Sequence, residues 1–347
     1  MAGGGQCRWA FATKDGEEFF LKEFLTPTYP LPSAPGSEAT KRRKLAKCNT
    51  FMDHHVSIMK ALNGAASTGG NLVTTKDFFR HEARFYKVTD KVDVSTLPVG
   101  DVHKLDQSRR LILASTVAHS LEILHRASLV HGDLKPPNVL LKSTTKNHFA
   151  AKLIDFDDAY FVGKPAPPEE LVGDMAYYSP ETQLYVREET GPAALKTSSD
   201  IFALGILFTE YFTGHKPLTN DSQTCATAVL KGAPCSTGLE KSWPQMDALI
   251  KNMMRLDSSA RPPIGEVKAS LKSMLHPTAP KRGPEPDPPA PGSGGSRLRG
   301  RLVKDASDAK SSPTPTPTPT PRAPGAPSRL RGDLISRRGG GSTERGR

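Results

Sequence analysis

Alternating apolar and polar positions mark the first part of the chain. Residues 8–25 alternate in this way around the turn residues Lys14-Asp15-Gly16, a pattern typical of a β-hairpin. After a proline-rich loop the apolar spacing changes and predicts a helix over 38–62. Two further short strands are expected around Leu72–Phe79 and Arg84–Val88. This part of the sequence therefore predicts a small β-rich region with a single helix.

The pattern is mainly helical after residue 91. Apolar residues at helical spacing predict an amphipathic helix over 108–127 and an apolar helix from Asp200 to Thr213. Strands first and helices later predict an α+β fold with two lobes and a cleft between them. The boundaries would be 1–91 for the β-rich lobe and 92–276 for the helical lobe. Weaker helices are expected at 244–255 and 264–275.

The last segment, residues 277–347, has a different composition. It contains 14 prolines, 11 glycines and no aromatic residue, so it cannot bury enough apolar surface to offset its ordering entropy. We therefore expect it to be disordered. It holds 14 Lys or Arg against 6 Asp or Glu, which is most of the net charge of +11. It is either a solvated linker or a docking segment for an acidic partner or an anionic membrane surface.

Cysteine spacing and hydropathy argue against a cysteine-bound metal site and against an integral membrane protein. The cysteines at 7, 48, 225 and 235 have no spacing typical of metal ligands, which favours reduced thiols. The sequence has no charged leader followed by an apolar stretch, and no run long enough to span a membrane. We therefore expect a cytoplasmic protein without an integral membrane segment. No specific nucleic acid partner is expected.

Two acidic motifs carry the candidate chemistry. The first reads His-Gly-Asp-Leu-Lys-Pro-Pro-Asn at 131–138, and the second reads Leu-Ile-Asp-Phe-Asp at 153–157. Phosphoryl transfer needs a carboxylate that orients and deprotonates a hydroxyl, and oxygen ligands that hold Mg²⁺. Asp133 and Asn138 would supply the carboxylate and one ligand, and Asp155 a second ligand. A β-hairpin between the motifs would bring these groups together.

Both motifs resemble those of the protein kinase family, His-Arg-Asp-Leu-Lys with a later Asn, and Asp-Phe-Gly. The resemblance implies ATP and Mg²⁺ as cofactors and proteins as substrates. It implies that Asp133 is the base, that Lys135 steadies the transferred phosphate, and that Asn138 and Asp155 bind the metal. A lysine two residues after the base is typical of serine/threonine kinases, so we expect transfer to Ser or Thr.

Three later positions extend the resemblance. Residues 173–181 resemble the end of the family's activation segment, and residues 199–205 resemble its buried helix, in which Asp200 would anchor the catalytic loop. Arg261 matches the family's arginine that pairs with a glutamate, here Glu181. The resemblance therefore implies structural roles for these three charged side chains.

The nucleotide side of the site is assigned by the same resemblance. Phe-Phe-Leu-Lys, which ends at Lys22, is similar to the family's Val-Ala-Ile-Lys, so this lysine would hold the α- and β-phosphates. Gly3, Gly4 and Gly5 form a flexible loop whose backbone N–H groups could approach phosphate. Counting back along the family pattern puts Met1 inside this loop, so its first strand is expected to be missing.

The resemblance also assigns residues to the back of the adenine pocket. Thr89 falls at the position that guards the back of this pocket, and the segment from Asp90 to Val92 would form the hinge. The family has an acidic residue on its small-lobe helix, and this sequence departs from that pattern. His55 stands at its position, and the nearest acid, Asp53, lies on a different face of a helix.

Two alternatives stay open. A pseudokinase that binds or scaffolds without catalysis would explain the missing helix acid. A small-molecule phosphotransferase of the aminoglycoside or choline type, which shares the fold, would explain Gly132 and Asp157. The complete set of catalytic side chains and the activation-segment motif favour a protein kinase.

Regulation has its own sequence signals. Gly132 replaces the arginine with which many protein kinases grip a phosphate on the activation segment. The segment from Asp155 to Glu181 has no threonine, and its single serine, Ser179, lies in the closing motif. We therefore expect activity that does not depend on Ser/Thr phosphorylation of this segment. Asp157 replaces the glycine of the metal motif and should hold that loop more firmly in one conformation.

Overall fold

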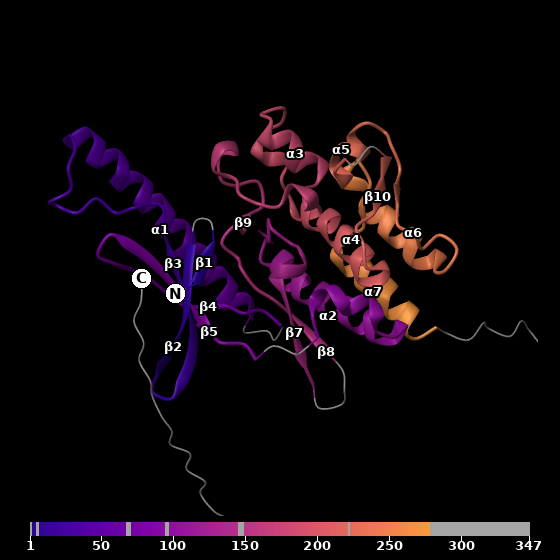
Figure 1. The fold of residues 1–347 in the computed structure, drawn as a ribbon. Coiled ribbons are helices and arrows are strands. Elements are labelled where there is room, and N and C mark those ends of the chain that lie inside the picture. Colours follow the sequence, from indigo (N-terminus) through magenta and orange to yellow (C-terminus); the bar gives the residue numbers. More distant parts are fainter. Residues whose placement is uncertain are drawn as a thin grey trace, which may run out of the picture. The chain divides into compact units, whose positions relative to one another are not determined.

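The structure is a computed structural model that describes residues 2–4, 7–66, 71–93, 97–144, 149–220 and 223–277. The predicted disordered tail lies outside the described residues from 278 onwards, as does Gly5. Helices and a sheet are both present, as the sequence predicts (Figure 1).

An antiparallel sheet forms the N-terminal part of the structure (Figure 1). The predicted hairpin is confirmed, with a turn at Asp15 (φ 53°) and Gly16 (φ 82°), where the left-handed backbone favours glycine. The strands follow the spatial order β1-β2-β3-β5-β4. Their bounds are Ala2–Gly4 (β1), Cys7–Lys14 (β2), Glu17–Phe24 (β3), Thr75–His81 (β4) and Arg84–Asp90 (β5).

The first strand corrects an expectation. The sequence predicted that this strand is missing, but Ala2–Gly4 forms a short strand paired with β2. The first three residues of β2 pair antiparallel with this strand, Cys7 with Gly4, Arg8 with Gly3 and Trp9 with Ala2. Gly3 and Gly4 therefore lie in a paired strand.

Helix α1, Glu38–Ala66, accounts for the predicted helix over 38–62 and continues for four more residues. It buries Cys48 and Ile58, and it packs against the sheet. Phe24, Phe78 and Phe85 of the sheet form a small apolar cluster with Cys48. The exposed side of the helix begins with a basic run, which leaves the apolar side to bury against the strands.

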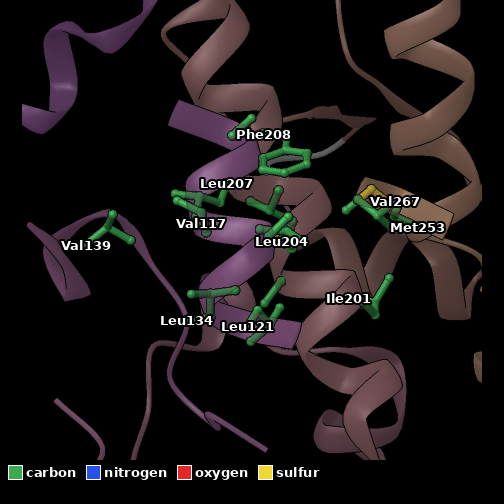
Figure 2. Close-up of a cluster of buried hydrophobic side chains, with 14 of the residues drawn as sticks. Val117, Leu121, Leu134, Val139, Ile201, Leu204, Leu207, Phe208, Met253 and Val267 are labelled. Atoms are coloured by element: carbon green, nitrogen blue, oxygen red, sulfur yellow. The ribbon is translucent and has the colours of Figure 1, made fainter. Parts of the chain in front are cut away.

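The rest of the structure is mainly helical and has the larger core. Figure 2 shows Val117 and Leu121 of α2 packed against Leu204 and Phe208 of α4. Both predicted apolar helices are confirmed, and so are the two weaker ones. The short helices α3 and α5 were not predicted. The bounds are Gln107–Arg126 (α2), Pro180–Val186 (α3), Thr197–Thr213 (α4), Cys225–Leu230 (α5), Pro244–Met253 (α6) and Ile264–Leu275 (α7).

Short strand pairs carry the two acidic motifs. β7 pairs with β8, and β6 pairs with β9 on either side of them. Backbone bonds from Leu153 N to Asn71 O (2.8 Å) and from Val73 N to Leu153 O (2.9 Å) join β8 to the segment before β4. The remaining bounds are Leu129–Val130 (β6), Val139–Ser143 (β7), Phe149–Leu153 (β8), Tyr160–Phe161 (β9), Leu218–Thr219 (β10) and Cys235–Ser236 (β11).

Within the described residues, every helix is too short or too polar to span a membrane.

Candidate active site

Helix α4 holds the loop between β6 and β7 through its residue Asp200. The buried carboxylate of Asp200 accepts hydrogen bonds from the backbone N–H groups of His131 (2.8 Å) and Gly132 (3.2 Å). His125 of α2 lies 2.9 Å from the same carboxylate through Nε2. The sequence indicated the anchoring aspartate but not His125, whose helical position gives no signal of this contact. These bonds fix the path of the backbone directly before Asp133.

Asp133 is buried, with 8% of its surface exposed. Its Oδ2 accepts a hydrogen bond from Asn138 Nδ2 (2.8 Å) and lies 2.7 Å from Lys135 Nζ. Its Oδ1 accepts one from the backbone N–H of Asp174 (3.3 Å). The amide, the ammonium group and the activation segment therefore orient this carboxylate together.

Asp155 directly follows the β7–β8 hairpin and has a left-handed backbone (φ 59°). Ile154 N donates to Asn138 O (3.0 Å), so the two motifs are bonded to one another. Lys22 Nζ lies 2.9 Å from Asp155 Oδ1. Burial, and then the negative charge of Asp157, raise the pKa of Asp155 above its ordinary value. The backbone bond thus joins the two motifs from which the sequence predicts the metal ligands.

The donor set at this point suits a hard divalent cation. Asn138 uses its amide nitrogen to donate to the backbone oxygen (2.7 Å) and the side chain of Asp133, which leaves the amide oxygen as the available ligand atom. Asp155 adds a carboxylate that is 35% exposed. Mg²⁺ is bound by such oxygen ligands, usually one or two from the protein. Asn138 and Asp155 therefore fit the metal that the sequence predicted.

Lys22 has a second acidic partner that the sequence did not assign to it. Its Nζ lies 2.5 Å from Asp157 Oδ2, and Lys87 of β5 binds the other oxygen of the same carboxylate. Burial opposes the charge on Lys22, but Asp157 and Asp155 outweigh burial and raise the pKa of this lysine. Burial also opposes the charge on Asp157, but Lys87 and Lys22 hold its pKa well below the ordinary range.

An aromatic group shares the face of the sheet from which Lys22 projects. Trp9 lies directly opposite Lys22 in the β2–β3 pairing, and Phe11 lies opposite Phe20. Cross-strand partners and alternate residues project from one face, so these side chains line the surface beside the lysine. The Trp9 and Phe20 rings stack at 5.8 Å, and 57% of Phe11 is exposed.

The other residues assigned to nucleotide binding lie in three places. Thr89 of β5 pairs with Phe20 across the sheet, on the face that carries the aromatic rings. Asp90 ends β5, is exposed and pairs with Lys76. Val92 follows it outside the strand, and Gly3 and Gly4 lie in β1.

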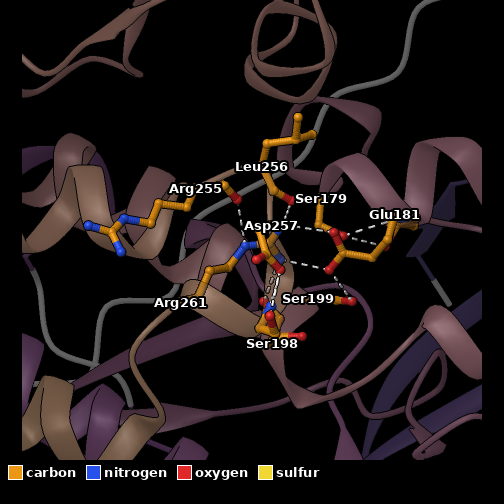
Figure 3. A network of polar contacts seen from close by, with 10 residues as sticks. Ser179, Glu181, Ser198, Ser199, Arg255, Leu256, Asp257 and Arg261 are labelled. Atoms are coloured by element: carbon orange, nitrogen blue, oxygen red, sulfur yellow. Dashed lines mark hydrogen bonds and ion pairs between the residues drawn. The ribbon is translucent and has the colours of Figure 1, made fainter. Parts of the chain in front are cut away.

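The end of the activation segment is held by a buried ion pair (Figure 3). Arg261 binds Glu181 through two parallel contacts, Nη1 to Oε1 (2.7 Å) and Nη2 to Oε2 (2.8 Å). Ser199 also donates to Glu181 Oε1 (2.8 Å). Burial raises the pKa of Glu181, but the hydrogen bonds and charge of Arg261 outweigh it, so the pKa lies below its ordinary value. The pair that the sequence indicated is therefore formed.

The earlier part of the activation segment packs closely against the catalytic loop. A Cβ atom added at Gly132 (φ 79°) would lie 2.3 Å from the backbone oxygen of Asp158. No side chain fits there, so the glycine in place of the family's arginine is required by this packing. Further contacts hold the segment, from Lys47 of α1 to Glu170 (2.9 Å) and from Tyr177 to Glu210 (2.5 Å).

A carboxylate oriented by an amide, an ammonium group and a backbone N–H, beside oxygen atoms of a kind that suits Mg²⁺, is the arrangement that phosphoryl transfer requires. Residues 38–271 match the family described as "Protein kinase domain". This match covers more than half of the chain, which therefore belongs to the protein kinase family.

Individual relatives agree with this membership. The chain is 33% identical over 167 residues to the serine/threonine-protein kinase AfsK of Streptomyces coelicolor, covering 47% of this chain and 19% of the relative. It is 32% identical over 190 residues to PknA of Corynebacterium glutamicum, covering 53% and 37%. A calcium/calmodulin-dependent serine/threonine-protein kinase of Malus domestica is 22% identical over 264 residues, covering 71% and 61%. The chain thus spans less than two thirds of the length of each.

Proposed function

We propose that this protein is an ATP- and Mg²⁺-dependent protein kinase that transfers the γ-phosphate to Ser or Thr hydroxyls of protein substrates. The observation that carries the proposal is the orientation of Asp133. Asn138 and Lys135 bind one carboxylate oxygen, while the backbone of Asp174 binds the other. Such a carboxylate is prepared to receive a proton from a hydroxyl docked on the activation segment.

Each side chain has a role in the proposed reaction. Asp133 accepts the hydroxyl proton as the substrate oxygen forms its bond to the γ-phosphorus, and the bond to the β–γ bridging oxygen breaks to release ADP. Lys135, which lies beside the base, balances charge on the transferred group. Lys22 binds the α- and β-phosphates. Asn138 and Asp155 would hold Mg²⁺, which would supply positive charge beside the phosphates.

The proposal also covers the residue preference, the nucleotide position, the cellular location and the tail. The preference for Ser or Thr rests on Lys135 and on relatives that are named serine/threonine kinases. The nucleotide would lie between the sheet and the helical part, in a two-lobed arrangement. The protein would act in the cytoplasm, and the basic tail would serve as a linker or dock on an acidic partner.

One observation favours the pseudokinase alternative. Helix α1 presents buried His55 where the family has an acid, and Asp53 is exposed. Against this alternative, Lys22 already has carboxylate partners. The small-molecule alternative is less favoured because the activation segment ends in the Glu181–Arg261 pair, which supports a surface for a protein substrate.

The test is transfer of radiolabelled γ-phosphate from ATP to a generic basic protein, with and without Mg²⁺. Wild-type protein should label the substrate, and Asp133→Asn should lose activity by about a thousand-fold or more, because the base and its charge are removed. Asp77→Asn, at an exposed position of strand β4, is the matched control and should keep full activity.

The outcomes separate the alternatives. Binding of ATP without any label would support the pseudokinase interpretation. Label that appears only on an added amino alcohol would support the small-molecule interpretation. Phosphoamino acid analysis of the labelled substrate then decides between Ser/Thr and Tyr.

A further inference from the structure

Helix α1 does not provide the carboxylate that would hold Lys22. The side chain it turns towards the sheet is His55, which is 7% exposed and packs against Phe51 (4.3 Å between ring centroids) and Phe78 (4.7 Å). Burial among these rings lowers the pKa of His55 to about 3, so the ring is neutral at physiological pH. The holding group must therefore come from another element.

The loop after β8 provides it instead. Lys22 Nζ lies 2.9 Å from Asp155 Oδ1 and 2.5 Å from Asp157 Oδ2. The side chain of Asp157 is 13% exposed and that of Asp155 is 35% exposed, so Asp157 is the more enclosed partner. One buried ammonium group between two carboxylates leaves a surplus negative charge, which is costly away from water.

Lys87 removes that surplus. It lies directly opposite Lys22 in the β3–β5 pairing, so both side chains project from the same face of the sheet. Its side chain is 8% exposed, and its ammonium group binds Asp157 Oδ1. The result is a linear chain of ion pairs in the order Lys87, Asp157, Lys22 and Asp155, with two positive and two negative groups.

We propose that Asp157 and Lys87 are positioning residues for the nucleotide site. Asp157 holds the ammonium group of Lys22 from the loop, and Lys87 holds Asp157. Because the holding carboxylate belongs to the same loop as Asp155, the phosphate-binding lysine and the metal-binding aspartate are positioned as one unit. The inference rests on the proposed function, since it assigns the phosphate-binding role to Lys22.

The test compares kcat, KM for ATP and the ATP dissociation constant of the wild type with those of Lys87→Met, Lys87→Arg, Asp157→Asn and the double variant Lys87→Met/Asp157→Asn. We expect KM and the dissociation constant to rise about ten-fold or more in Lys87→Met and Asp157→Asn, because each loses a charged hydrogen bond. Lys87→Arg should retain most of the affinity, since it keeps the charge. Lys14→Met, on the exposed end of β2, is the matched control and should equal the wild type.

The double variant gives the readout that a purely structural role would not produce. If the two residues act as one unit, the double variant should bind ATP no more weakly than the single variant with the lower affinity. Multiplicative effects on affinity would overturn the proposal. Loss of affinity in Lys87→Met but not in Asp157→Asn would also overturn it, because Lys87 would then contact phosphate directly.

A measurement on the wild-type protein covers the case in which a variant fails to fold. Reductive methylation should modify Lys22 and Lys87 at least ten-fold more slowly than exposed Lys14, because ion-paired, buried ammonium groups react slowly. Equal rates would overturn the proposal. The ATP dissociation constant requires no turnover, so a failure of phosphate transfer is distinguished from a failure of this inference.

Discussion

The strongest expectation for stability concerns Arg261, whose side chain is fully buried. Besides its two contacts with Glu181, the guanidinium group donates to the backbone oxygens of Ser198 (2.8 Å) and Arg255 (2.8 Å) (Figure 3). Arg261→Met keeps a similar apolar stem but removes all of these bonds. It also leaves the carboxylate of Glu181 buried without its cation.

The size of the effect follows from that unpaired carboxylate. Removing one partner of a buried ion pair costs about 3–5 kcal/mol of unfolding free energy. A domain of this size loses about 2–4 °C of Tm for each kcal/mol. We therefore expect Arg261→Met to lower Tm by about 6 °C or more.

Differential scanning fluorimetry and urea unfolding measure this effect. Arg255→Met is the matched control, because the Arg255 side chain is exposed, and it should change the unfolding free energy by no more than about 0.5 kcal/mol. Glu181→Gln combined with Arg261→Met should be less destabilised than the sum of the single variants. A loss below about 1 kcal/mol for Arg261→Met would refute the reasoning, since the pair would then be worth no more than a surface ion pair.

The same pair makes stability depend on pH. The pKa of Glu181 is lowered in the folded protein, so its contribution is complete above the ordinary glutamate pKa. The contribution is lost as pH falls through the lowered folded-state pKa. The unfolding free energy of the wild type should therefore fall more steeply than that of Glu181→Gln between about pH 5 and about pH 3. Parallel profiles would contradict this assignment.

Three further expectations are open to direct measurement. Gly132→Ala should cost about 2 kcal/mol or more, because its Cβ would lie 2.3 Å from a backbone oxygen, whereas Gly163→Ala, with a similar φ and a nearest contact of 3.8 Å, should cost about 1 kcal/mol; equal losses in Tm would contradict the clash. In the Trp243→Phe variant, ATP should change the fluorescence of Trp9, which lies opposite Lys22. Unchanged Trp9 emission at saturating ATP would show that the adenine ring does not bind beside Trp9. Phosphatase-treated protein should keep its kinase activity, because the one serine of the activation segment, Ser179, is buried as the N-cap of α3; activity that returns only after rephosphorylation of the segment would contradict this.

Local sequence determined much of the fold and the centre of the site. Alternation around Asp15-Gly16 set the first hairpin, and helical spacing set α2 and α4, because each pattern needs only neighbouring residues to choose its period. Asp133 and Asn138 are five residues apart, so a short loop brings them within 2.8 Å. The short helices α3 and α5 carry too few turns for a periodic signal.

The tertiary structure decided which polar side chains meet. Lys87 reads in sequence as one lysine of a strand, and His125 as one polar position of a helix. Their partners, Asp157 and Asp200, come from distant segments, and a single residue's shift in strand register would turn Lys87 to the opposite face of the sheet. Contacts of this kind depend on how the sheet packs over the β7–β8 hairpin and on how α2 packs against α4. Sequence spacing therefore located the reacting groups, whereas only packing determined which side chains hold them in position.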